Sequence, residues 1–182
     1  LIQIRNNNGG SSTFQLDGSA GSISINAPVG VTCRNNTVGT IQNLSGTNIF
    51  NGNILLFEGG NTHTVQSDSG MIVFTGTNQY VGGLTGGRTY YFTGAGHHYL
   101  VGPLLNSTNG APIALLKTNS GSLTMDAVNT YGNGTTLAGG SLIVNGTLPA
   151  GTFTISSGTT LSGHGVIYPA VTLPSGATLA PG

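Results

Sequence analysis

Apolar and polar residues alternate along this chain in short runs, and each run is soon closed by Gly, Asn or Pro. Examples are Ser-Ile-Ser-Ile at residues 22–25, Phe-Thr-Ile at 153–155 and Val-Thr-Leu at 171–173. Other runs are continuously apolar, such as Met-Ile-Val-Phe at 71–74 and Leu-Ile-Val at 142–144. Alternation with a period of two is typical of half-buried strands, and short continuous runs suit buried ones. The pattern therefore predicts many short β-strands.

Helix signals are nearly absent from the sequence. No long stretch avoids Gly and Pro while placing apolar residues three and four positions apart. The longest helix-tolerant stretch, residues 113–119, is short and follows Pro112. We therefore expect an all-β chain.

The C-terminal part of the chain repeats itself. Residues 153–162 align with residues 171–180 at an offset of 18, so that apolar, Ser-Gly and Thr-Leu positions coincide. Residues 134–139 resemble residues 158–163 at an offset of 24. A period of this length is too long for a simple hairpin and too short for a β-α-β unit, and it is typical of solenoids.

Such repeats predict a parallel β-helix, or β-solenoid, in which the strands of one coil pair with those of the next about 4.8 Å away. The Ile, Leu, Val and Phe residues would face the core, and Gly and Asn would occupy corners, where the backbone often needs a positive φ angle. Residues 1–182 would form a single β-solenoid segment. Residues 1–130 would have less regular coils with longer loops, and residues 131–182 regular repeats.

Composition changes the expected surface of this solenoid. Only 4% of residues are charged, against about 25% in average soluble domains, and Gly supplies 32 positions. Ser, Thr and Asn must therefore solvate the surface. Disordered chains combine weak hydrophobicity with high net charge, whereas this chain is 37% hydrophobic with no net charge. We therefore expect it to be ordered.

Zero net charge also argues against nucleic acid as a partner. The cations are dispersed along the chain and equal the acids in number, so no basic footprint forms. The apolar runs fall far short of about 18 residues, the length of a membrane-spanning helix. We therefore expect no membrane insertion by this segment.

Cys33 is the single cysteine, so an internal disulfide is excluded. It could act as a nucleophile or as an intermolecular bridge, but no neighbouring motif supports reactivity. We interpret it as a small buried hydrophobe. The chain begins at Leu1 without Met or a signal peptide, which indicates a processed or excised product.

From about residue 131 to residue 182 the chain resembles the autotransporter-associated β-strand repeat of large bacterial passenger proteins. Three motifs carry the resemblance: Gly-Thr-Thr-Leu-Ala-Gly-Gly-Ser-Leu at residues 134–142, Ser-Gly-Thr-Thr-Leu-Ser-Gly-His-Gly at 157–165, and Ser-Gly-Ala-Thr-Leu-Ala-Pro-Gly at 175–182. The resemblance implies a right-handed parallel β-helix, export to the bacterial cell surface, and no catalytic residues common to the family.

Catalytic chemistry finds little support in the sequence. Glycosidases need two carboxyl groups within about 5 to 10 Å of one another, and the four acids here are Asp17, Glu58, Asp68 and Asp126. Asp17 and Glu58 could lie two coils apart on one face, and Glu58 and Asp68 could lie on adjacent faces. With so few candidates we predict a non-enzymatic protein without a cofactor, in which these acids are solvated or corner residues.

The histidines do not predict a metal site. His97 and His98 are adjacent, and neighbouring residues of a strand point to opposite faces, so the two cannot easily bind one ion. His63 and His164 have no evident companions. Four acids are also too few for the series of oxygen-rich Ca²⁺ sites found in other β-rolls.

Residues 82–103 are the most aromatic part of the chain and predict a departure from the bare coil. Two interpretations stay open. The aromatic side chains could stack along successive coils, or they could form an exposed surface for a ligand or partner, because tyrosine joins apolar area to a polar tip. The candidate residues of such a surface are Tyr90, Tyr91, His97, His98 and Tyr99.

Together these features predict a structural or adhesive segment of a large secreted bacterial surface protein. Its partners would be flanking repeats of the same chain, or copies of itself stacked head to tail into a fibre. Strands left open at the end of a solenoid invite pairing, and little charge opposes it. The alternative is a carbohydrate-binding or carbohydrate-active β-helix that uses residues 90–99 as a platform for surface glycans.

Overall fold

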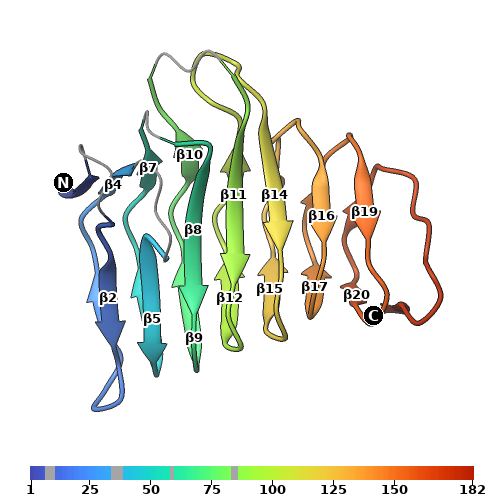
Figure 1. The fold of residues 1–182 in the computed structure, drawn as a ribbon, viewed down its shortest axis with the longest axis horizontal. Coiled ribbons are helices and arrows are strands. Elements are labelled where there is room, and N and C mark those ends of the chain that lie inside the picture. The colour runs from blue at the N-terminus through green and yellow to red at the C-terminus, as the bar shows by residue number, and fades with distance from the viewer. Residues whose placement is uncertain (7–10, 34–38, 58–59, 83–85) are drawn as a thin grey trace.

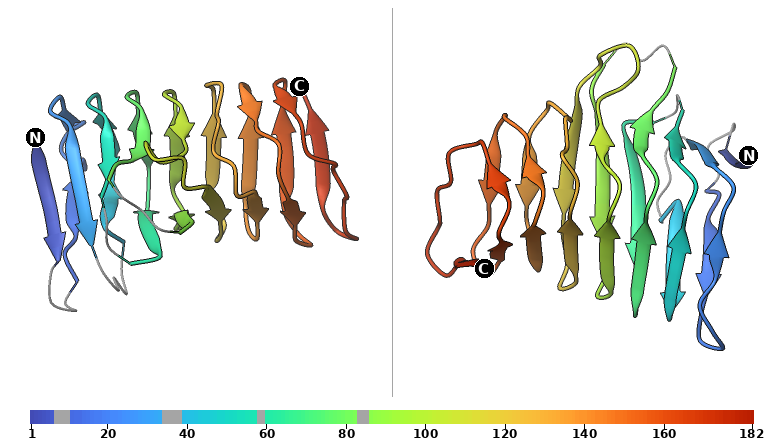
Figure 2. Two further views of the ribbon diagram at one scale, coloured as in Figure 1. Left: turned by 90° about the horizontal axis from the view of Figure 1, so that it is seen from above. Right: turned by 180° about the vertical axis from the view of Figure 1, so that it is seen from behind.

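In this computed structural model, residues 1–6, 11–33, 39–57, 60–82 and 86–182 are described. These residues form 22 short strands and no helix, which confirms the all-β prediction. All the described strand pairs are parallel, and the strands lie side by side along one axis from the N-terminus to the C-terminus (Figures 1 and 2). None of the described residues belongs to a helix that could cross a membrane.

Three sheets and a short fourth one make up the molecule. Sheet A contains β1 (Ile2–Asn6), β4 (Val29–Cys33), β7 (Ile54–Leu56), β10 (Asn78–Tyr80) and β13 (Leu104–Leu105). Sheet B contains β2 (Phe14–Asp17), β5 (Ile41–Ser45), β8 (Thr62–Ser67), β11 (Arg88–Thr93), β14 (Ile113–Lys117), β16 (Thr135–Leu137) and β19 (Phe153–Ile155). Sheet C contains β3 (Ser24–Ile25), β6 (Thr47–Phe50), β9 (Met71–Phe74), β12 (His97–Leu100), β15 (Ser122–Met125), β17 (Ser141–Val144), β20 (Thr160–Gly163) and β22 (Thr178–Pro181). Sheet D contains β18 (Thr147–Leu148) and β21 (Val166–Ile167).

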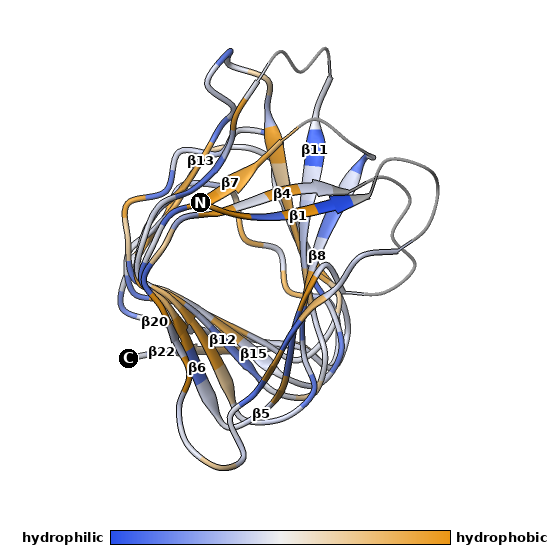
Figure 3. Cartoon of the chain, turned by 90° about the vertical axis from the view of Figure 1, so that its left-hand side faces the viewer, coloured by the Kyte–Doolittle hydropathy of each residue, from blue (hydrophilic) through white to orange (hydrophobic). Residues whose placement is uncertain are grey.

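As far as β13, the chain passes through sheets A, B and C in turn and then returns to sheet A. Seen along the long axis, sheets B and C meet at one corner and sheet A occupies the third side (Figure 3). Sheet D continues that third side, because the backbone N–H of Thr130 donates to Leu104 and Val128 forms a parallel bridge with Thr147 of β18. This arrangement is the parallel β-helix that the repeats predicted.

Alternation within each strand decides which side chains face the core. In β15, Leu123 is fully buried between the partly exposed Ser122 and Thr124. The parallel register then stacks like on like, since Leu123 pairs with Leu142 and Leu142 pairs with Leu161. Each leucine buried in this way stabilises the fold by roughly 1.5–3 kcal/mol.

Coil length changes part-way along the helix. In the N-terminal coils, equivalent residues are 24 to 28 positions apart, as with Gln15 and Gln42. From β14 onward the spacing shortens to 18–20 positions, as with Ser122 and Ser141. The change falls close to residue 130, where the sequence repeats become regular.

One predicted alignment of the repeats is partly confirmed. Thr160 pairs with Thr178 and Leu161 with Leu179, at the offset of 18 that the sequence indicated. Residues 171–173, however, form no strand, so the alignment fails in its first half.

The alignment at an offset of 24 is wrong as a structural register. Residues 134–139 contain β16 of sheet B, whereas residues 158–163 contain β20 of sheet C. The sequences agree because each strand follows a turn glycine with a positive φ, 85° at Gly134 and 74° at Gly158. The same local turn thus serves two different sheets.

Glycines stack at the corner between sheets B and C. This first glycine stack consists of Gly18, Gly46, Gly70, Gly96, Gly121 and Gly140. A Cβ atom on Gly70 would lie 2.2 Å from the carbonyl oxygen of Gly46, and φ at Gly70 is +71°. Gly70 therefore needs both the absent side chain and the left-handed backbone that glycine tolerates, as predicted for a corner.

A second glycine stack lies at the corner between sheet C and the third side. It consists of Gly52, Gly76 and Gly102 and, on the far side of Ala127, Gly146 and Gly165. A Cβ atom on Gly102 would lie 2.1 Å from the carbonyl oxygen of Gly76, yet φ at Gly102 lies outside the left-handed region. Glycine is required at this corner because successive coils approach closely, and not because of the positive φ angle that the sequence suggested.

Candidate functional site

The predicted aromatic surface is only partly exposed. Tyr91, His97 and Tyr99 face outward, whereas Tyr90 and His98 are fully buried. The prediction of an exposed ligand or partner surface is therefore wrong for Tyr90 and His98. Adjacent strand residues point to opposite faces, and these two occupy the inward positions of β11 and β12.

The outward aromatic residues lie on two faces of the helix. Tyr91 is on the outer face of sheet B, and His97 and Tyr99 are on the outer face of sheet C. The hydroxyl of Tyr91 shares a hydrogen bond of 2.8 Å with Thr118, and Nδ1 of His97 lies 2.7 Å from Oγ of Ser122. These contacts tie each side chain to the next coil, so they do not form a single platform.

Asp126 receives hydrogen bonds from two neighbouring coils. The hydroxyl of Tyr99 donates to its carboxylate, and Nδ2 of Asn145 donates to Oδ1 at 2.9 Å. The bond to Asp126 raises the pKa of the Tyr99 hydroxyl, because the proton it donates is harder to remove. Asp126 thus links three successive coils of the outer surface.

The other described acids have similar contacts. Asp68 accepts hydrogen bonds from Nε2 of Gln42 at 2.6 Å and from Nε2 of Gln66 at 2.5 Å. Asp17 accepts one from the hydroxyl of Ser45. That bond is the main reason that the pKa of Asp17 is lowered. Each carboxylate therefore joins its own coil to a neighbour.

Two predictions fall outside the described residues. Glu58, the proposed companion of Asp17 or Asp68, is one, and the side chain of Cys33 is the other. The backbone of Cys33 pairs with Asn6. Within the described residues, no group of three His, Cys, Asp or Glu side chains could hold a metal ion.

Two buried histidines lie in the interior of the helix. Nδ1 of His63 is 2.6 Å from the hydroxyl of Tyr80, and Nδ1 of His98 is 3.3 Å from the carbonyl oxygen of Ser122. In the described part of the chain, Nε2 of both rings has no hydrogen-bond partner. Burial lowers the pKa of His63 to about 4 and that of His98 to about 4. Both rings are therefore neutral at pH 7.

Lys117 is a buried cation that the sequence showed only as one of four dispersed charges. Its Nζ donates to the backbone carbonyl oxygens of Thr118 at 2.6 Å, Asn119 at 3.2 Å and Gly139 at 3.4 Å. Burial lowers the pKa of Lys117 to about 8. Alternation along residues 113–117 could have shown that Lys117 is buried. Lys117 is the third inward-facing residue of β14, after Ile113 and Leu115.

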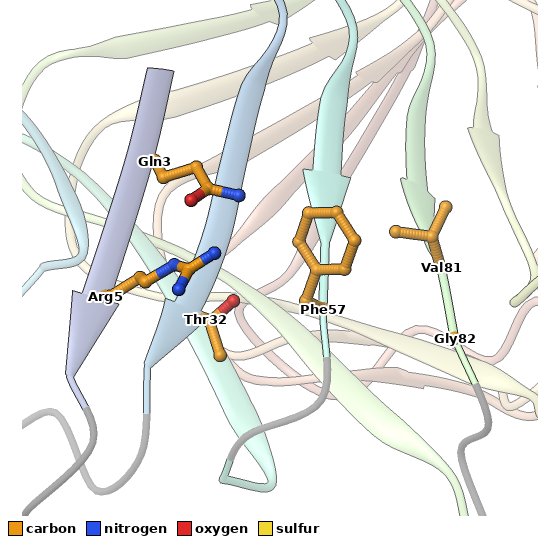
Figure 4. Close-up of a pocket in the computed structure, with 6 residues that line it drawn as sticks. All are labelled: Gln3, Arg5, Thr32, Phe57, Val81 and Gly82. Atoms are coloured by element: carbon orange, nitrogen blue, oxygen red, sulfur yellow. The ribbon is translucent and has the colours of Figure 1, made fainter. Parts of the chain in front are cut away.

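A pocket with a mixed lining lies on the outer face of sheet A (Figure 4). Its described lining residues are Gln3, Arg5, Thr32, Phe57, Val81 and Gly82. Arg5 pairs with Thr32 of β4, and the backbone N–H of Phe57 donates to Val31 beside it. Arg5, Thr32, Phe57 and Val81 therefore form one outward column across four successive coils.

The ring of Phe57 is seated by a glycine. A Cβ atom on Gly30 of β4 would lie 2.8 Å from Cε2 of Phe57, so any larger residue there would push the ring away. Thr32 lies between Arg5 and Phe57, and these side chains line the pocket (Figure 4). The pocket thus has a small-residue floor between a cationic wall and an aromatic wall.

Sequence reasoning did not find this pocket. Alternation in residues 1–5 places Gln3 and Arg5 on the outer face, because Ile4 between them is buried. Phe57 follows β7 directly, and β7 pairs with β4 at an offset of 25 residues, a spacing that the less regular N-terminal repeats did not reveal. The sequence pattern could therefore have indicated Gln3 and Arg5, but not the residues of the later coils that complete the pocket.

A second surface feature is an open apolar groove beside sheet D. Its described lining residues are Val128, Asn129, Thr130, Thr147, Pro149, Ala150 and Tyr168. Val128 and Tyr168 are each 68% exposed. The described lining contains no charged side chain that would select one class of ligand.

Comparison of the chain with protein-family models, with curated proteins and with solved structures found no match. The resemblance of residues 131–182 to the autotransporter-associated repeat thus stays a prediction from its motifs.

Proposed function

We propose that this chain is a non-enzymatic structural or adhesive segment of a large secreted bacterial surface protein. The observation that carries the proposal is the continuous parallel pairing of sheet C from β3 to β22, with glycine stacks at two corners. Such a molecule is a rod in which each coil is held by its neighbours. A rod of this kind suits the role of a spacer that extends from a surface.

The outer contacts support a structural role for the polar residues. Asp68 and Asp126 accept hydrogen bonds from side chains of neighbouring coils. Asn51 donates to Asn26 at 2.8 Å and accepts from Thr75 at 3.2 Å, which links three successive coils. Neutral amides and hydroxyls can therefore hold the coils together in a chain with so few charges.

The partners in this proposal are flanking repeats or further copies of the chain. In the structure, β3 and β22 are the edge strands of sheet C, and each has a single neighbouring strand. An unpaired edge offers backbone N–H and C=O groups to another strand. Coils of the same protein, or another copy stacked head to tail, can fill these edges.

Surface labelling tests the proposal. An antibody against the chain is applied to intact cells that produce it and is detected by gold labelling in electron micrographs. We expect gold on surface projections without permeabilisation. Labelling that requires permeabilised cells would contradict the proposal, and light scattering of the purified chain at rising concentration would separate self-stacking from flanking repeats.

The alternative function, carbohydrate binding through residues 90–99, loses support from the geometry. Tyr90 and His98 are buried, and the outward side chains of that stretch lie on two faces. A carbohydrate-binding role would need another site.

A further inference from the structure

The pocket on sheet A brings several kinds of side chain together on a surface with few charges. Its described lining holds one cation, one amide, one hydroxyl and one aromatic ring, and no acid. The three described acids are bonded elsewhere, to Ser45, to Gln42 and Gln66, and to Tyr99 and Asn145. The guanidinium of Arg5 is exposed and can be reached by a ligand.

We infer that this pocket binds a carboxylated sugar, such as a uronic acid residue of an acidic polysaccharide. The carboxylate would bind to Arg5, whose planar guanidinium presents paired N–H donors that match two carboxylate oxygens.

Gln3 and Thr32 supply the polar contacts that a sugar ring requires. Figure 4 shows both side chains beside Arg5, Gln3 on the same strand and Thr32 on the next. An amide both donates and accepts hydrogen bonds, and so does a hydroxyl. Sugar hydroxyls have the same dual character, so they can pair with either side chain.

Phe57 supplies the apolar wall. Its ring is held in place by the space at Gly30, and Val81 lies beyond it on the next coil. An aromatic face packs against the C–H face of a sugar ring, while the polar edge of the sugar turns toward Gln3 and Thr32. One apolar wall and a few placed polar groups are typical of small-ligand sites.

A peptide fits this pocket less well than a sugar. Extended peptides bind sheets by pairing their backbone with an open edge, but β4 at the pocket floor is already paired with β1 on one side and β7 on the other. A single strand separates the two walls of the pocket, which are roughly 10 Å apart at the backbone. This space suits a compact ring.

The inference does not depend on the proposed surface role, because the pocket can bind a sugar wherever the protein is located. Calorimetric titration of the whole chain with a galacturonic acid trisaccharide tests it, with a galactose trisaccharide as the neutral probe. We expect saturable binding of the acidic probe alone, weakened by added salt because the charges are exposed.

Variants locate the site. Arg5→Gln should weaken binding of the acidic trisaccharide about tenfold to a hundredfold, since hydrogen bonds to charged groups contribute about 1.5–3 kcal/mol. Gln3→Ala should weaken it by about threefold to tenfold. The matched control is Gln15→Ala, an exposed glutamine on β2 that lies outside the pocket lining, and it should leave binding unchanged.

Several outcomes would overturn the inference. These are no binding of the acidic probe, equal binding of the neutral probe, and equal loss in the Gln15→Ala control. Tighter binding of a short peptide with a free carboxylate would also overturn it, because the site would then recognise a peptide. None of these outcomes affects surface labelling, so failure here is distinguishable from failure of the proposed function.

Discussion

Two histidine side chains in the interior lie where charge cannot be tolerated. His63 and His98 are buried, and burial lowers the pKa of each to about 4 from an ordinary value of 6.5. In the unfolded chain both rings would take up a proton as the pH falls below 6.5. In the folded protein, both rings stay neutral until about pH 4. The stability that depends on these neutral rings is therefore fully present above pH 6.5, and it is lost as the pH falls from 6.5 to about 4.

Replacing His98 by Leu should make the fold less sensitive to acid. In sheet C, His98 pairs with Ile72 and Leu123, so the column already accommodates aliphatic side chains. Between pH 6.5 and pH 4, the free energy of unfolding of His98→Leu should fall by up to about 1.4 kcal/mol less per pH unit than that of the native chain. Urea unfolding at a series of pH values measures this difference.

The control for this variant is His164→Leu, which removes an exposed histidine outside the core. An equal change of the acid response in both variants would show that burial of the ring is not the cause. An acid response of His98→Leu that matches the native chain would show that the buried ring does not control it.

Single residues also show how far the sequence determined the site. Alternation correctly places His97 and His98 on opposite faces, and the same rule separates Tyr90 from Tyr91 in the structure. It cannot say which member of each pair faces the core, because both are amphipathic. The answer depends on the register with neighbouring coils, where His98 meets Ile72.

Individual strands and turns illustrate the same limit. Residues 113–119 tolerate a helix in isolation, yet residues 113–117 form β14, because β11 and β16 pair with it on both sides. Short strands were predictable from local alternation. Which of the three sheets a strand joins depends on the whole coil, and local alternation does not determine it. The alignment at an offset of 24 therefore matched a strand of sheet B with a strand of sheet C.

The second glycine stack gives a direct test at the level of the turn. Gly102→Ala places a Cβ atom 2.1 Å from the carbonyl oxygen of Gly76, and backbone cannot yield as a flexible side chain can. We expect a loss of about 2 kcal/mol or more in the free energy of unfolding, as for other overpacked sites. Urea unfolding at pH 7 measures the change.

Gly86→Ala serves as the matched control. The nearest atom that its Cβ would meet is Nη1 of Arg88 at 3.9 Å, an ordinary contact. Its stability should stay within about 0.5 kcal/mol of the native value. Equal losses in the two variants would mean that crowding between coils is not the reason for Gly102.

For the molecule as a whole, stability should vary along the axis. An interior strand such as β11 has a paired strand on both sides, whereas β1 and β22 have one each. In repeat architectures each unit is stabilised mainly by its nearest neighbours, so the ends open more readily than the middle.

Hydrogen exchange followed by mass spectrometry tests this gradient. Backbone amides of β8, β11 and β12 should exchange most slowly, and those of β1 and β22 fastest. Equally slow exchange in β22 and β11 would indicate that a further strand covers β22, as in a stack of copies.

The coil is also the unit by which such a protein can change in evolution. Because faces alternate along each strand, gain or loss of a single residue would exchange core and surface. Loss of a full turn, such as the 19 residues from Ser122 to Gly140, would return the chain to the same register. The reach of the molecule can therefore be inherited only in discrete increments of about 4.8 Å, each gained or lost by duplication or deletion of one whole turn.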